Sequence, residues 1–169
     1  MLRLLGLVLI SALSLSACVD TTPQMGPDGK PMPRRYYIGA GESSAIQYRM
    51  LDSVNALRQA AGAAPVQLNA QLNAAAATHS RDMSIQGRPW HFGSDGSSPI
   101  DRVGRVGYEG EFRGETISET YETEIETLGA WLEQPDTRRI ILDKEAVQMG
   151  FAWHQDPNGK IWWTLVMGG

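Results

Sequence analysis

Hydrophobic and polar positions follow the period of a helix in the first part of the folded region. Apolar residues recur there at spacings of four, four and three: Ile46, Met50, Val54 and Leu57. Side chains at this spacing share one helix face. Ser43 or Ser44 can cap the N-terminus, and Gly62 and Pro65 end the pattern. The sequence therefore predicts a helix over about residues 43–62 with one buried face.

A second helix is predicted within LNAQLNAAAATHSRDMSIQG (68–87), ending at Gly87. The residues of its buried face recur at helical spacing: Leu68, Leu72, Ala75, His79 and Met83. The alanines permit close approach of the element that packs on them. Because His79 shares this face, we expect a core histidine whose ring nitrogens find backbone or side-chain partners.

Two further helices are marked by their caps. In SSPIDRVGRVGY (97–108), serine followed by proline suits an N-cap and first helical position, and the helix should end near Gly104 or Gly107. In TEIETLGAWLEQ (123–134), Thr123 and Glu126 are spaced as a capping box, and Pro135 is expected to end the helix. Its apolar face should contain Ile125, Leu128 and Leu132.

The remaining pattern has the period of strands. RGETIS (113–118) predicts a short strand, and residues 147–155 and 160–168 flank the turn sequence DPNG as a hairpin. The second hairpin strand is apolar on both faces, so both faces should be covered. Helices followed by strands predict an α+β domain in three layers, helix on sheet on helix.

The N-terminal end indicates export. Arg3 precedes an apolar run over residues 4–15, which suits a signal peptide and is shorter than the ~20 residues that span a bilayer. The run ends in LSAC (15–18), which resembles the bacterial lipobox. This predicts a lipoprotein signal peptide over residues 1–17 and lipidation of Cys18. The alternative is an ordinary secretory signal in which Cys18 is incidental.

The region after the signal divides into a tether and one domain. Residues 18–42 are rich in proline and glycine, which indicates a flexible tether, and residues 43–169 should form one domain. Tyr36, Tyr37 and Ile38 either dock on that domain or belong to the tether. Cys18 is the only cysteine, so the domain must be stabilised by packing without disulfides.

Charge and the signal limit the partners and the location. The formal net charge is -4, which disfavours nucleic acid and anionic membrane surfaces. The lipid on Cys18 would then be the link to the membrane, with the domain facing the periplasm in the cell envelope. Val19 lacks the acidic character that retains many lipoproteins at the inner membrane, so the outer membrane is favoured if the organism is Gram-negative.

Known catalytic motifs are not found in the sequence. It contains no HExxH and no GxSxG, and no thiol is free after lipidation. His91 lies in RPWHFGSDGSSPIDR (88–102) among several serines and aspartates. Residues adjacent in sequence rarely form a catalytic triad, and turns and caps explain these serines.

The order of several segments resembles the CAP superfamily, which comprises the cysteine-rich secretory, antigen-5 and pathogenesis-related proteins. The similar segments are LDSVNALRQAAGAAPVQLNAQLNAAAATHSRDM (51–83), GYEGEFRGETIS (107–118), WLEQPDTRRIIL (131–142), MGFAW (149–153) and GKIWWTLVMGG (159–169). The resemblance covers roughly residues 43–169. It implies an α-β-α sandwich with a mainly antiparallel central sheet.

The resemblance also implies a cleft lined by two histidines and two acids that can hold a divalent metal. His91 matches the first histidine and Glu115 the first acid, and Glu133 is a candidate for the second acid. Thr137, beside Arg138, stands where the second histidine is expected, and Thr116 replaces an asparagine.

The set of metal ligands is therefore incomplete. His91 and Glu115 supply two weak candidates, whereas a zinc site normally uses three or four protein ligands. We expect no bound metal and no other cofactor. Arg138 could contribute to binding an anionic ligand or pair with a nearby glutamate.

Three functions stay open from the sequence. The first is a non-catalytic binding module for an apolar small molecule or envelope component, with His91, Glu115, Glu133, Thr137 and Arg138 lining the cleft. The second is a metal-dependent hydrolase of peptides or envelope polymers. The third is a structural interaction module, in which His91 and Glu115 only brace a loop against the sheet.

Overall fold

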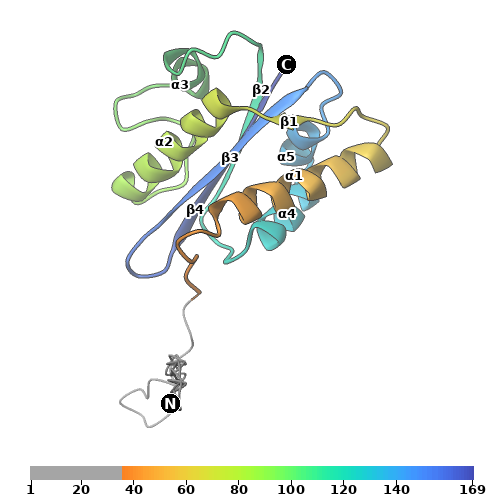
Figure 1. The fold of residues 1–169 in the computed structure, drawn as a ribbon. Helices are drawn as coiled ribbons and strands as arrows, with labels where there is room; N and C mark the ends of the chain where they lie inside the picture. Colours follow the sequence, from red (N-terminus) through yellow and green to blue (C-terminus); the bar gives the residue numbers. More distant parts are fainter. Residues whose placement is uncertain (1–35) are drawn as a thin grey trace, which may run out of the picture. The chain divides into compact units, whose positions relative to one another are not determined.

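The structure is a computed structural model and describes residues 36–169. The predicted signal peptide, Cys18 and most of the tether lie outside these residues. Helices and strands follow in the order α1 (Ser43–Ala60), β1 (Gln67–Leu68), α2 (Ala70–Gln86), α3 (Pro99–Arg105), β2 (Phe112–Ser118), α4 (Glu124–Glu133), α5 (Pro135–Ile141), β3 (Gln148–Gln155) and β4 (Ile161–Gly168) (Figure 1).

The strands form one mixed sheet in the order β1-β3-β4-β2. The long pairs β3–β4 and β4–β2 are antiparallel, and the short strand β1 pairs parallel with β3. Strand β2 lies at the edge, with Glu115 opposite Val166 and Thr116 opposite Leu165. The expected α+β class and the mainly antiparallel sheet are confirmed.

Helices cover both faces of the sheet. On one face α1, α4 and α5 enclose the larger apolar core, which includes Met50, Trp131, Ile141, Phe151 and Leu165. On the other face α2 and α3 enclose a smaller cluster of Leu72, Ala75, Ala76, Val103 and Val166. Figure 1 shows α2 and α3 on one side of the strands and the remaining helices on the other. The three-layer arrangement follows from this division.

Local signals at three helix ends predict the caps correctly. Gly87 caps α2 with a φ of 66°. Ser98 and Thr123 form capping boxes with Asp101 and Glu126. Each hydroxyl accepts the backbone N–H of the residue three positions later, which satisfies a donor that the first helical turn leaves unpaired.

Three local predictions were wrong. The N-cap of α1 is Glu42, which makes no side-chain capping bond, so neither Ser43 nor Ser44 caps it. Leu68 belongs to β1, because Asn69 caps α2. Ile125 is 47% exposed, and α4 buries Leu128 and Trp131 in its place. Pro135 ends α4, as predicted, and it also begins α5, since proline is tolerated at a first helical position.

The segment before α1 contacts the hairpin of β3 and β4. The Gln155 side chain donates to the Tyr36 carbonyl at 2.8 Å and accepts from the Ile38 N–H at 3.0 Å. The Tyr37 hydroxyl donates to the Pro157 carbonyl at 2.8 Å. These three residues therefore dock on the domain. Within residues 36–169, no helix has the length and apolar character needed to cross a membrane.

Candidate binding site

Glu115 lies at the centre of a buried polar cluster beneath α2 and α3. Its position opposite Val166 directs its side chain to the face that α2 covers. The residue is 5% exposed. A single nitrogen of Arg102, Nη2, lies 2.9 Å from Oε1 and 2.8 Å from Oε2. Both carboxylate oxygens are therefore engaged by a guanidinium that α3 supplies.

Two histidines meet the same carboxylate. His91 Nδ1 lies 2.9 Å from Glu115 Oε1, and His79 Nε2 lies 3.6 Å from that oxygen. His79 Nε2 is also 3.0 Å from the Trp90 carbonyl oxygen. Because a carbonyl can only accept, Nε2 of His79 carries the proton in this contact. The other ring nitrogen of His79, Nδ1, has no partner among the described residues.

The cluster also fastens the loop between α2 and α3. Arg102 Nη1 donates to the His91 carbonyl at 2.9 Å and to the Ser97 carbonyl at 3.2 Å. Together with the bond from His79 to the Trp90 carbonyl, these contacts hold two consecutive peptide groups of the loop. The loop therefore depends on buried side chains for its position, and His91 reaches Glu115 as a result.

Charge and burial have opposing effects on the acids and bases of the cluster. Burial acts to raise the pKa of Glu115, but the hydrogen bond from His91 and the charge of Arg102 outweigh it, so the pKa is lowered. Burial lowers the pKa of His79, because the neighbouring carboxylate does not compensate fully for lost hydration. At neutral pH the cluster thus contains an ionised Glu115 and a neutral His79.

The structure brings only part of the expected cleft together. His91 and Glu115 are in contact, whereas Glu133, Thr137 and Arg138 make no hydrogen bond to either of them. The Thr137 hydroxyl donates to the carbonyls of Trp131 and Gln134. Arg138 Nε donates to the Leu132 carbonyl at 2.5 Å. Glu133 is exposed at the end of α4.

Strand alternation explains this separation. Gly114 faces α5, since a Cβ there would lie 2.7 Å from Ile140 Cγ1. Successive residues of a strand point to opposite faces, so Glu115 points away from α5. Arg138 lies instead beside a separate groove, together with Arg113, Gly114 and Ile140. The residues of α5 and those around Glu115 consequently belong to different faces of the sheet.

The divalent metal implied by the resemblance does not fit these residues. A metal ligand must present a free lone pair, yet both oxygens of Glu115 contact Arg102, whose fixed positive charge would repel a cation. Within residues 36–169, no three histidine, aspartate or glutamate side chains are arranged to hold a metal ion.

Two members of the cluster were not predicted from the sequence. His79 was expected in the core but was not linked to Glu115, and Arg102 was assigned only to a helix. The one available signal was the helical face of His79, which directs it to the sheet. Nothing local marks Arg102 as buried, because its burial follows from α3 packing against β2.

A family model covers most of the domain. The model of the CAP family, described as the cysteine-rich secretory protein family, matches residues 51–167. The uncharacterized protein YkwD of Bacillus subtilis (strain 168) is 27% identical over 125 residues, which cover 74% of this chain and 48% of that protein. The chain thus spans about half the length of this curated relative.

Solved bacterial structures share the fold. An outer surface protein from Borrelia burgdorferi superposes with a TM-score of 0.68 at 14% identity, over 80% of this chain and 98% of that one. An extracellular protein with an SCP domain from Bacillus anthracis gives 0.64 at 18% identity, over 78% and 45%. A cysteine-rich secretory protein from Staphylococcus aureus gives 0.65 at 11% identity, over 85% and 44%.

Proposed function

The chain belongs to the cysteine-rich secretory protein (CAP) family, and from this premise we propose that it is a lipid-anchored protein of a bacterial cell envelope. Its domain binds an apolar small molecule or envelope component without converting it. The structural relatives described as an outer surface protein and an extracellular protein support the envelope location. Lipidation of Cys18 would hold the domain at the membrane and leave it facing the periplasm.

The arrangement of Glu115 carries the proposal of binding without catalysis. A general base must reach a substrate proton, and a metal ligand must reach an ion. Glu115 reaches neither, because it is buried and its two oxygens contact Arg102. A hydrolase would need this carboxylate free, so the contacts favour a bracing role for it.

His91 is the member of the cluster that a ligand can contact. Its side chain is 48% exposed although Nδ1 is bound to Glu115. Two aromatic residues flank it in sequence, and the rings of Trp90 and Phe92 lie 5.5 Å apart between centroids. An imidazole edge beside aromatic surface suits a ligand with both apolar and hydrogen-bonding groups.

Native mass spectrometry of the full chain tests the binding role. We would purify the protein from bacterial membranes in mild detergent and look for a co-purifying molecule of defined mass. His91→Ala should reduce the occupancy at least ~10-fold, as expected for loss of a buried contact to the ligand. His154→Ala is the matched control, because this half-buried histidine lies on β3 and pairs with Asp156. No bound molecule in the wild type, or equal loss in both variants, would overturn the binding role.

The anchor has its own test. A fatty-acid probe supplied to growing cells should label the wild-type chain and not Cys18→Ala. The unlabelled variant should appear in the soluble fraction, because removal of the acyl chains removes the membrane contact. Persistent labelling of Cys18→Ala would refute lipidation at this residue while leaving the binding role untouched.

A further inference from the structure

The end of α2 and the loop after it expose large apolar side chains. Ile85 on the last turn of the helix is 72% exposed, and Phe92 in the loop is 48% exposed. The rings of Phe92 and the half-buried Trp90 lie 5.5 Å apart between centroids, so exposed apolar residues are grouped here. We call the surface formed by Ile85, Arg88, Trp90, His91 and Phe92 the aromatic surface.

Side chains of α2 and α3 hold the backbone of this loop. The carbonyls of residues 90, 91 and 92 accept hydrogen bonds from His79, Arg102 and Gln86 at 3.0, 2.9 and 3.1 Å. The Trp90 indole N–H donates to the Gln86 amide oxygen at 2.7 Å. These polar groups are thus satisfied within the protein, and the rings that reach solvent present mainly carbon. A loop fixed in this way loses little conformational entropy when a partner covers it.

Arg88 adds a positive charge to the aromatic surface. It is exposed, and its guanidinium carbon lies 3.3 Å from the centroid of the Trp90 ring. A guanidinium over an indole face is held by cation–π attraction. Tryptophan is enriched where lipid headgroups meet acyl chains, and arginine can extend from apolar surroundings to the headgroups. The surface therefore has the composition of a membrane-interface contact.

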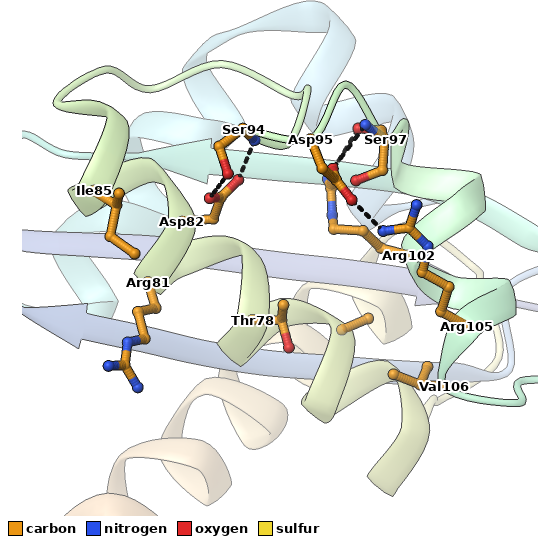
Figure 2. A pocket seen from close by; sticks show the side chains of 11 residues that line it. Thr78, Arg81, Asp82, Ile85, Ser94, Asp95, Ser97, Arg102, Arg105 and Val106 are labelled. Atoms are coloured by element: carbon orange, nitrogen blue, oxygen red, sulfur yellow. Dashed lines mark hydrogen bonds and ion pairs between the residues drawn. The ribbon is translucent and has the colours of Figure 1, made fainter.

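The acids beside the aromatic surface are bound within the protein. Figure 2 shows Ile85 on α2 and Asp82 one turn before it, with the Asp82 carboxylate accepting from Ser94. The same view shows Asp95 paired with Arg105. Because these carboxylates already have partners, a cationic ligand would have to displace them. Apolar carbon and the guanidinium over the indole are what this surface offers to a partner.

The aromatic surface lies at the end of the domain where the chain from the predicted anchor enters. On the last turn of α2 the Ser84 hydroxyl donates to Asp156 at 2.5 Å. The next residue of that hairpin turn, Pro157, accepts from the Tyr37 hydroxyl at 2.8 Å. Figure 1 shows the turn between β3 and β4 and the start of the described chain at the same end of the domain. The segment that continues toward Cys18 therefore leaves the domain close to the aromatic surface.

From this arrangement we infer that the aromatic surface docks on the headgroup region of the phospholipid bilayer that holds the lipid anchor. The rings of Trp90 and Phe92 enter the bilayer interface, and Arg88 contacts phosphate oxygens. His91, whose Nδ1 is bound to Glu115, has Nε2 left for a hydrogen bond to a headgroup. The inference rests on the proposed lipid anchor and identifies the envelope component of the proposed function as phospholipid.

The anchor makes a weak contact sufficient. The chain from Cys18 to Tyr36 can extend at most about 60 Å, so the domain stays close to the bilayer surface. Tethering replaces a bimolecular encounter by one at high effective concentration. Because the net charge of -4 disfavours anionic membranes, we assign the contact to a zwitterionic bilayer and to apolar burial.

Fluorescence quenching in vesicles tests this contact. The acylated full chain would be reconstituted into vesicles of phosphatidylethanolamine and phosphatidylcholine, with bromine on the acyl chains of the phosphatidylcholine near the headgroups. Bromine quenches only nearby indoles, so tryptophan emission should be lower than in unbrominated vesicles. Trp90→Phe should abolish the quenching, and Trp153→Phe, which changes a half-buried tryptophan on β3, should retain it. No quenching in the wild type, or quenching that survives in Trp90→Phe, would overturn the inference.

A matched pair of variants tests whether apolar burial holds the surface on the bilayer. Ile85 on α2 and Ile125 on α4 are both exposed, but these helices cover opposite faces of the sheet. Ile85→Glu should lose most of the Trp90 quenching, because a carboxylate is costly to place in an apolar interface. Ile125→Glu should be quenched like the wild type. Equal quenching in the two variants would contradict docking through the aromatic surface.

Flotation of the same vesicles separates docking from anchoring. A wild-type chain that floats with the vesicles but shows no quenching would keep its anchor and refute the docking. A chain that does not float would refute the anchor, and the inference falls with it. If a molecule co-purifies in a manner that depends on His91 while quenching is absent, the binding role stands and its ligand is not the bilayer.

Discussion

The two faces of the sheet are built from different side chains. On the face of α1, α4 and α5, Phe151 and Trp163 stack with ring centroids 5.6 Å apart and planes 5° from parallel. On the face of α2, the sheet buries Glu115 against His79 and Arg102, and the Ser80 hydroxyl donates to Thr164 at 2.8 Å. One face is close-packed apolar surface, and the other carries a polar network.

The two buried arginines show what this difference means. Arg58 donates to four backbone carbonyls, those of Ala64, Ile141, Asp143 and Ala146, at 2.8–2.9 Å. Arg102 binds a carboxylate and two carbonyls, and its Nε has no partner within the described residues. A fully satisfied arginine indicates a structural role. An incompletely satisfied one marks a buried donor that the packing of this face leaves without a partner.

Breaking the ion pair of the polar face should have the largest effect. Glu115→Ala leaves Arg102 buried without its counter-charge, so the free energy of unfolding should fall by ~3–5 kcal/mol. Urea denaturation monitored by tryptophan fluorescence measures the loss. The double variant Glu115→Leu with Arg102→Met should recover most of it, because no buried charge is then unpaired. A loss below ~1 kcal/mol in Glu115→Ala would show that the pair is not buried in solution.

Sequence patterns predicted the long helices and strands, and family resemblance identified two of the four residues of the polar cluster. Helix α2 could be predicted because its apolar period and Gly87 act locally. Strand β1 has two residues, too few for any period, and Pro135 fits both the end of one helix and the start of the next. His91 and Glu115 were found through family resemblance, whereas Arg102 needed the packing of α3 on β2.

Strand alternation explains why Thr137 and Arg138 lie apart from Glu115. The pattern of β2 shows that Gly114 and Glu115 face opposite ways, but it does not show which helix covers which face. Only the folded sheet, with α5 against Gly114, separates Thr137 from Glu115. Glu133 was likewise placed by its position near Trp131, and its exposure at the end of α4 could not be read from that spacing.

Acid should weaken the polar face before the apolar one. Burial lowers the pKa of His79 in the folded state, so the unfolded chain binds a proton first as the pH falls below ~6.5. This histidine therefore contributes stability above that pH, which is lost on acidification. Between pH 7.5 and 5.5 the loss is at most ~1.4 kcal/mol.

Denaturation of the wild type and of His79→Gln at pH 7.5 and pH 5.5 tests whether His79 causes this loss of stability. In His79→Gln the free energy of unfolding should depend less steeply on pH, because the contribution of His79 is missing. If the free energy of unfolding depends on pH as steeply in His79→Gln as in the wild type, other groups cause the loss. Below ~4.3 the lowered pKa of Glu115 adds a second loss, since the unfolded glutamate is protonated before the folded one.

The same change, threonine to valine, made once on each face of the sheet should give the smallest changes in stability. Thr116 faces the apolar core, and its hydroxyl has no partner among the described residues, so Thr116→Val should leave stability unchanged or raise it by up to ~1 kcal/mol. Thr164 accepts from Ser80 on the polar face, so Thr164→Val should lower stability by ~1 kcal/mol. Thermal unfolding measures both, and effects of the same sign would remove the distinction between the faces.

Zinc titration of the purified full chain by calorimetry tests most directly whether Glu115 is committed to Arg102. The structure leads us to expect no saturable zinc binding tighter than ~1 mM, because the carboxylate oxygens already contact a guanidinium. One zinc ion bound per chain at ~1 µM or tighter, and lost in Glu115→Gln, would contradict this arrangement.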